Sequence, residues 1–246
     1  MTRVTRILRY PLKSHGREAL EQVDLIAGEA MPFDRIWAVA HDASTADGSI
    51  WVPCVNFSRV SKAPALMAIS SRYDSETGQL TLSHPAKADL TFDPDTDVKA
   101  FLQWVTPLVP QNRALPDRIV KLAGRGFTDS DFPSVTLCNM ASHRAVEEKM
   151  RRKLSIHRWR GNIWFDSDLP WVEFDWMGRD VRVGGCVLTL RERTDRCLAT
   201  TANPETGQRD ADTLSVLESW GHQDFSVRAE VKTGGPVCLG DGVELL

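Results

Sequence analysis

The run Val4–Tyr10, VTRILRY, is followed directly by Pro11-Leu12-Lys13-Ser14, and it sets the pattern for the first half of the chain. Apolar and polar residues alternate along this run, as they do in a strand with one buried face. Similar short runs recur further on, separated by turn-forming residues, at 23–26, 36–41, 66–69 and 80–83. Short strands at this spacing predict a barrel or a sandwich.

The later part of the chain adds helices to the strands. Helical spacing of Val98, Leu102 and Val105 predicts a helix between Asp95 and Leu108. A second helix is expected after Asn139, which is suited to cap it, and a third from Asp212 to Trp220. Further strands are expected at 162–166, 180–183, 187–191, 225–231 and 243–245, with a turn at 234–236.

These elements predict a fold that is mostly β with a few helices, of the α+β class. Residues 111–133 are rich in proline and glycine, so we expect them to form loops near a lobe boundary. The chain is long enough for one large β domain or two small ones. We therefore expect one domain at 1–112 and a second at 113–246.

Composition excludes several functional classes. Of the 246 residues, 42% are hydrophobic and 26% are charged, as in an ordinary globular protein. The net charge of -3 argues against a general nucleic-acid binder. No apolar run approaches the roughly 20 residues of a membrane helix. Met1–Arg9 lacks the apolar stretch of a secretory signal, so we expect a cytoplasmic protein without a membrane partner.

The five cysteines are scattered and odd in number: Cys54, Cys138, Cys186, Cys197 and Cys238. No CxxC pair occurs, which argues against a structural zinc site or a cysteine-ligated iron–sulfur cluster. A disulfide scaffold is also not expected at this density. Free thiols in a reducing compartment fit this pattern best.

Cys197 has the most informative surroundings of the five. It follows an expected strand, stands beside Arg196, and precedes the loop Asn203-Pro204-Glu205-Thr206-Gly207. A thiolate in such a place can bind a soft metal or carry sulfur. The alternative is a small buried hydrophobic residue, which is the common role of a free cysteine.

Two groups of cations accompany this cysteine. Lys13 and Ser14 follow the first expected strand, and Arg35 precedes a later one; together they could bind an anion, or they could be solvated charges. Arg158 and Arg160 flank a tryptophan ahead of a glycine. Their guanidinium groups suit a phosphate or another polyanion, although a basic helix end is the alternative.

Motifs for nucleotide binding, serine hydrolysis and zinc proteolysis are missing from the sequence. Taken together, the residues that remain resemble the MOSC family, named for the C-terminal domain of molybdenum-cofactor sulfurases. The resemblance covers nearly the whole chain, through the motifs YPLKS (10–14), DRIW (34–37), RWRGNI (158–163), WVE (171–173), RC (196–197), NPETG (203–207) and GDGV (240–243). It implies a MOSC-type β-barrel and an N-terminal β-barrel-like lobe.

The resemblance also implies a site. In relatives similar to the mitochondrial amidoxime-reducing component, a molybdenum–molybdopterin cofactor is bound, and the cysteine of the Arg-Cys pair ligates the metal. That position is Cys197 here. No pyridoxal phosphate is required. The same resemblance implies cofactor contacts from Lys13, Ser14, Arg35, Ser142, Arg160, Asn162 and Arg196.

The activity implied is that of a molybdenum-dependent oxidoreductase. It would reduce small N-hydroxylated compounds with electrons from a separate ferredoxin-, cytochrome- or flavoprotein-type donor. Two alternatives stay open: a sulfurtransferase that carries a Cys197 persulfide, and a non-catalytic carrier of the cofactor. Asp195 and Asn203 depart from the family pattern, and Asp195 leaves the substrate class open.

Overall fold

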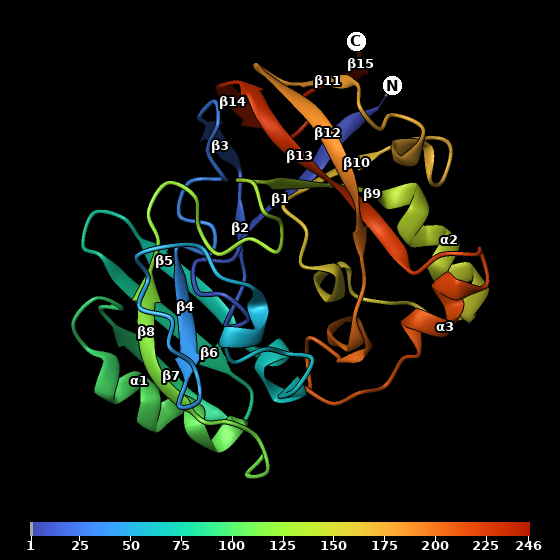
Figure 1. The fold of residues 1–246 in the computed structure, drawn as a ribbon. Coiled ribbons are helices and arrows are strands. Elements are labelled where there is room, and N and C mark those ends of the chain that lie inside the picture. The colour runs from blue at the N-terminus through green and yellow to red at the C-terminus, as the bar shows by residue number, and fades with distance from the viewer. Residues whose placement is uncertain (1) are drawn as a thin grey trace.

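The computed structural model describes residues 2–246, which form two lobes (Figure 1). The large lobe is built on a curled eight-stranded sheet with the strand order β15-β11-β12-β13-β9-β10-β1-β2. Its strands are β1 (Arg3–Arg9), β2 (Glu18–Leu20), β9 (Val135–Asn139), β10 (Ile163–Asp166), β11 (Asp180–Val183), β12 (Cys186–Asp195), β13 (Asp224–Thr233) and β15 (Val243–Leu245).

The small lobe holds two further sheets and one helix. Strand β4 (Trp37–His41) pairs with β8 (Pro116–Lys121), while β5 (Ser70–Asp74), β6 (Gln79–His84) and β7 (Lys87–Phe92) form a three-stranded meander. Helix α1 (Val98–Val105) packs against this lobe, where Phe92 and Phe101 stack with ring centroids 5.2 Å apart.

The two halves of the sequence are joined through their strands. The first strand, β1, lies inside the large sheet and pairs antiparallel with β10, so that Val4 faces Phe165 (Figure 1). Strand β3 (Gln22–Leu25) pairs in turn with β14 (Gly235–Cys238). The start of the chain is therefore held by backbone hydrogen bonds to its last third.

Apolar side chains fill both faces of the large sheet. One face packs around the inward residues of β9, β12 and β13, such as Leu137, Leu188 and Val227. The other face is covered by α2 (Met140–Met150) and α3 (Thr213–Glu218), over a cluster that contains Trp159, Trp164 and Phe225. The fold class is mostly β with few helices, as the sequence predicts.

The predicted cap at Asn139 is present, and the third helix has a cap at Asp212 that was not predicted. The Asn139 side chain accepts a hydrogen bond from the Ala141 backbone N–H, and Asp212 accepts one from Ser215. The first predicted helix ends in a 3₁₀ turn at Thr106–Leu108, where Pro107 stands. Among the described residues, no helix has the length and apolar character needed to cross a membrane.

Three local predictions are wrong. The strand expected at 66–69 is a 3₁₀ turn, Pro64–Ala68, because Pro64 favours the first position of a helical turn and the strand starts only at Ser70. Strand β8 runs through residues expected to form loops. Strand β14 replaces the turn expected at 234–236; its proline is tolerated because the ribbon has only two strands.

Candidate functional site

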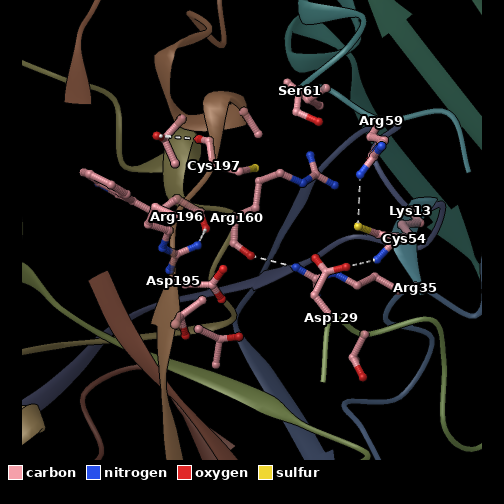
Figure 2. A pocket seen from close by; sticks show the side chains of 18 of the residues that line it. Lys13, Arg35, Cys54, Arg59, Ser61, Asp129, Arg160, Asp195, Arg196 and Cys197 are labelled. Atoms are coloured by element: carbon pink, nitrogen blue, oxygen red, sulfur yellow. Dashed lines mark hydrogen bonds and ion pairs between the residues drawn. The ribbon is translucent and has the colours of Figure 1, made fainter. Parts of the chain in front are cut away.

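A pocket of about 350 Å³ lies where the two lobes meet. Strand ends and loops of the large lobe supply one wall, and the segment from Trp51 to Ser61 supplies the other (Figure 2). Its lining carries seven cations against two carboxylates: Lys13, Arg35, Arg59, Arg158, Arg160, Arg196 and Arg228 against Asp129 and Asp195. This excess of positive charge suits an anionic ligand.

Cys197 lines this pocket two residues after the end of β12. Its backbone begins a 3₁₀ turn, Leu198–Thr201, and its carbonyl oxygen accepts a hydrogen bond from the Thr200 N–H at 3.1 Å. The residue is exposed, and no described residue donates a hydrogen bond to its sulfur. The backbone is thus fixed while the thiol stays available to a ligand.

Arg196 anchors the segment that carries Cys197. Its guanidinium donates to the carbonyl oxygens of Trp159 and Phe225, at 2.8 Å from Nη1 and 2.9 Å from Nε. It also donates to Ser226 Oγ, and burial lowers its pKa to about 10. Its donors are already occupied by the protein, so its structural role is to position Cys197.

Arg160 is the cation in the pocket with the least compensation. Burial first, and then the nearby Arg35 charge, lower the pKa of its guanidinium to about 10. No described carboxylate forms an ion pair with it. The guanidinium carbon of Arg160 lies 4.5 Å from the centroid of the Tyr10 ring. The guanidinium makes one hydrogen bond to a described residue, a long one of 3.4 Å to the Gly16 carbonyl oxygen. Figure 2 shows this side chain pointing into the pocket, as Cys197 does.

Arg35 lies beside Arg160 but is paired. Its Nη1 contacts Asp34 Oδ2, and its Nη2 donates to the Arg160 carbonyl oxygen at 2.7 Å. Burial alone would lower the pKa of Arg35, but the Asp34 carboxylate outweighs it and raises that pKa. Arg35 is therefore a fixed positive charge at the floor of the pocket.

Lys13 is also paired, whereas the Ser14 hydroxyl has no hydrogen-bond partner in the described part of the chain. The Lys13 ammonium donates to the Phe127 carbonyl oxygen at 2.6 Å and to Asp129 Oδ1 at 2.5 Å. Partial desolvation alone would raise the pKa of the half-exposed Asp129 carboxyl group, but Lys13 outweighs it and holds that pKa at about 2. Ser14 lines the pocket in the left-handed region, with φ of 66°.

Left-handed backbone recurs at this pocket. Arg35 and Arg160 have φ of 54° and 50°, alongside Ser14. Such conformations cost residues other than glycine on the order of 1 kcal/mol or more, and they concentrate at ligand sites, where the surrounding structure maintains them. Three of the eight residues predicted for the site thus have strained backbones, and these backbones set the direction of their side chains.

Two predicted residues do not line the pocket. Ser142 is buried in α2, where its hydroxyl donates to Glu173 at 2.7 Å and accepts from the Trp171 N–H at 2.8 Å. Asn162 is buried too: its Oδ1 accepts from the Thr136 N–H, and its Nδ2 donates to the Leu8 carbonyl oxygen. The structure brings the other six together: Lys13, Ser14, Arg35, Arg160, Arg196 and Cys197.

The small lobe contributes residues that the sequence did not mark. Arg59 and Cys54 line the opposite wall, and Arg59 Nη1 lies 3.4 Å from Cys54 Sγ (Figure 2). Like Arg160, Arg59 has no ion pair with a described carboxylate. No sequence motif marks this pair, because the two residues enter the pocket only when the lobes meet.

The donor set limits how a metal could bind here. The described residues contain no group of three or more histidine, cysteine, aspartate or glutamate side chains that could hold an ion. The pocket does offer an exposed thiol at Cys197 and cations without carboxylate partners. This set fits a metal that arrives with an anionic organic group supplying the remaining ligands.

Comparisons with known proteins match both lobes. The family model of the MOSC N-terminal beta barrel domain matches residues 1–109, and that of the MOSC domain matches residues 126–244. A search of curated protein sequences finds no match.

A search of solved structures finds two proteins that are similar to this chain. The YUAD protein from Bacillus subtilis is similar at 11% identity with a TM-score of 0.48, over 100% of this chain and 96% of its own. YiiM from Geobacillus stearothermophilus is similar at 13% identity with a TM-score of 0.37, over 46% of this chain and 53% of its own.

Proposed function

The chain belongs to the MOSC family, and on this basis we propose that its interlobe pocket binds a molybdenum–molybdopterin cofactor through the Cys197 thiolate. The family relates the chain to molybdenum-cofactor proteins. The residues present in the pocket fit such a group, because they combine a soft sulfur ligand with a surplus of cations.

One observation carries this proposal: the half-buried Arg160 guanidinium has no carboxylate partner among the described residues and shares the pocket with Cys197. A cation that is partly removed from water and lacks a counter-charge destabilises a folded protein. An anionic ligand in this pocket would remove that cost, so the pocket has a built-in preference for negative charge. A neutral ligand would leave the cost in place.

The pocket residues divide by how free they are to contact a ligand. Arg160 and Ser14 are available to hold a phosphate group, and Cys197 is available to the metal. Lys13 and Arg35 already have carboxylate partners and add positive charge from behind. When bound, the cofactor would supply two-electron redox chemistry, while the chain binds and orients it.

We propose that the enzyme reduces small N-hydroxylated compounds. Converting N–OH to N–H consumes two electrons and two protons and releases water. The electrons would come from a separate ferredoxin-, cytochrome- or flavoprotein-type donor. Asp195 lines the pocket with its side chain 82% exposed and one oxygen 3.3 Å from Arg228.

The cellular location of the protein and the division of its chain into two domains are also part of the proposal. We propose a cytoplasmic location, a compartment in which the five free cysteines would stay reduced. We keep the division at 112/113 as a division of the sequence, although β8 of the second part pairs with β4 of the first.

The exposure of Cys197 also supports a second candidate function. A thiol without a hydrogen-bond donor among the described residues, in a pocket open to solvent, can carry a persulfide and pass its sulfur to another molecule. This sulfurtransferase would need no bound metal. A third possibility is a carrier that binds the cofactor without catalysis.

The deciding experiment measures molybdenum and pterin in protein purified from a host that makes the cofactor. We expect close to one of each per chain in the wild type and the loss of molybdenum in Cys197→Ser. Cys238→Ser is the matched control, because Cys238 is a half-buried thiol outside the pocket, and it should keep the metal.

The alternatives give different results in the same samples. A folded wild type without molybdenum and pterin, but with a persulfide on Cys197 by mass spectrometry, would show the sulfur carrier. Bound cofactor without reduction of amidoximes or hydroxylamines, whatever the electron donor, would show a protein that carries the cofactor without catalysis. Cys197→Ser protein that retains the metal would overturn the ligand assignment.

A further inference from the structure

A second pocket, of about 220 Å³, lies in the small lobe on the other side of the 3₁₀ turn Cys54–Asn56. Drug-sized ligands occupy cavities of roughly 300 to 1,000 Å³, so this pocket suits a smaller molecule. Its lining includes His41, Phe57, Ser58, Arg59, Lys62 and Arg113.

The lining combines apolar walls with unbalanced positive charge. Arg59, Lys62 and Arg113 line the pocket, and no acidic residue among residues 2–246 does. None of the three forms an ion pair with a described carboxylate. Phe57 and Val109 supply apolar surface. A ligand that matches this lining has an apolar body and a negative charge.

Buried polar groups in the wall of this pocket also indicate a ligand with a polar group. Ser58 is only 7% exposed, and its hydroxyl has no hydrogen-bond partner among the described residues. His41 bonds the Val55 carbonyl oxygen through Nε2 at 2.8 Å, which requires the proton on Nε2 and leaves Nδ1 without a partner. Buried polar groups are normally satisfied, so an unpartnered hydroxyl in a pocket wall marks a place for a ligand oxygen.

We propose that this second pocket binds a small carboxylate with an aliphatic or aromatic body. The three cations would attract the carboxylate, and the Ser58 hydroxyl can donate to it. The apolar wall would take the hydrocarbon part. Inorganic anions lack this apolar part, and neutral alcohols lack the charge, so both should bind more weakly.

Arg59 connects this pocket to the first one, because it lines both. It also donates to Cys54 Sγ at 3.4 Å on the side of the first pocket. A carboxylate in the second pocket competes for the same guanidinium. We therefore expect its binding to change how fast Cys54 is alkylated, whether or not molybdenum is present.

The test is calorimetric titration of the wild-type protein with hexanoate and with hexan-1-ol. We expect saturable binding of one hexanoate per chain, at least about tenfold tighter than hexanol. Lys62→Glu/Arg113→Glu should weaken hexanoate binding by at least about tenfold. Arg6→Glu/Arg182→Glu, which makes the same change in net charge at exposed positions of β1 and β11, should bind hexanoate normally.

Several results would overturn the proposal. One is the absence of saturable hexanoate binding at millimolar concentrations. Another is equal loss of binding in both double variants, which would mean a non-specific charge effect. A third is unchanged Cys54 alkylation, read by peptide mass spectrometry with saturating hexanoate, which would disprove the link through Arg59. Each readout is independent of the metal content of Cys197 variants.

Discussion

Arg35 donates a 2.7 Å hydrogen bond to the backbone oxygen of Arg160, and both guanidinium groups lie against the Tyr10 ring, at 4.7 and 4.5 Å from its centroid. Asp34 pairs with Arg35, whereas no described carboxylate pairs with Arg160. Arg160, which lacks a counter-charge among the described residues, is therefore held next to Arg35, which has one.

Replacing Arg160 should raise the stability of the cofactor-free protein and weaken cofactor binding. Arg160→Met keeps an unbranched stem but removes the charge whose pKa is depressed to about 10. At neutral pH that charge destabilises the fold, so we expect the cofactor-free variant to be more stable by about 1–3 kcal/mol. Denaturant unfolding measures this, and molybdenum content should fall at least about tenfold.

The control for this substitution is Arg6→Met, which removes an exposed cation from β1. It should change neither the free energy of unfolding nor the molybdenum content. A less stable Arg160→Met protein that keeps its cofactor would show that Arg160 serves the fold and not the ligand.

Protonation of His15 should destabilise the loop that carries Lys13 and Ser14. His15 is fully buried, and burial lowers its pKa to about 4. Between pH 6.5 and 4 the unfolded chain binds a proton that the folded chain does not, so stability falls as pH falls through this window. The loss should approach about 3 kcal/mol.

His15→Asn tests this, because asparagine can still donate to the Lys13 carbonyl oxygen that His15 Nδ1 contacts at 2.7 Å. Unfolding at pH 8 measures the lost contacts, and the difference between pH 8 and pH 4.5 isolates the titration. That difference should be smaller in the variant. An identical pH dependence in both proteins would rule out His15 as its source.

Arg196→Lys should destabilise the protein more than it affects the ligand. A single ammonium group cannot reach the Trp159 and Phe225 carbonyl oxygens together, so buried acceptors lose their donors. We expect a loss of about 2–4 kcal/mol in the free energy of unfolding. Arg191→Lys, at an exposed position of β12, is the control. An Arg196→Lys protein of normal stability without cofactor would instead indicate direct contact.

Cys54→Ser tests whether the second thiol in the pocket takes part in metal binding. We expect molybdenum content to equal that of the wild type, because Cys54 lies on the opposite wall beside Arg59. Metal analysis beside Cys197→Ser checks this. Metal loss in Cys54→Ser alone, with a normal thermal midpoint, would make Cys54 a ligand.

Much of the fold follows from local patterns, and the failures have local causes. Alternation predicts β1 and β6 because one face of each is buried, whereas the apolar run of β4 is buried on both faces. It misses β14 because Gly234, Gly235 and Pro236 favour turns. Gly235 is required there by close packing: a Cβ on it would lie 2.4 Å from the Gly185 carbonyl oxygen.

The site could be predicted only as a set of residue types. Sequence cannot separate an arginine whose donors are free, such as Arg160, from one whose donors are occupied, such as Arg196. The same holds for Gly161, which stands between Arg160 and Asn162: its lack of a side chain is required because a Cβ there would come within 2.1 Å of Cys138 Sγ. Packing, not anion binding, explains that glycine.

The pairing of β1 with β10 bears on how the protein is made. Thr5 bonds Trp164 across 159 positions of the chain. At about 5–20 residues per second, a ribosome takes roughly 8 to 30 s to synthesise that interval. During this time the nascent first strand has no native neighbour on one edge and exposes a β-prone segment. Its three arginines, Arg3, Arg6 and Arg9, discourage association with other nascent chains until β10 emerges.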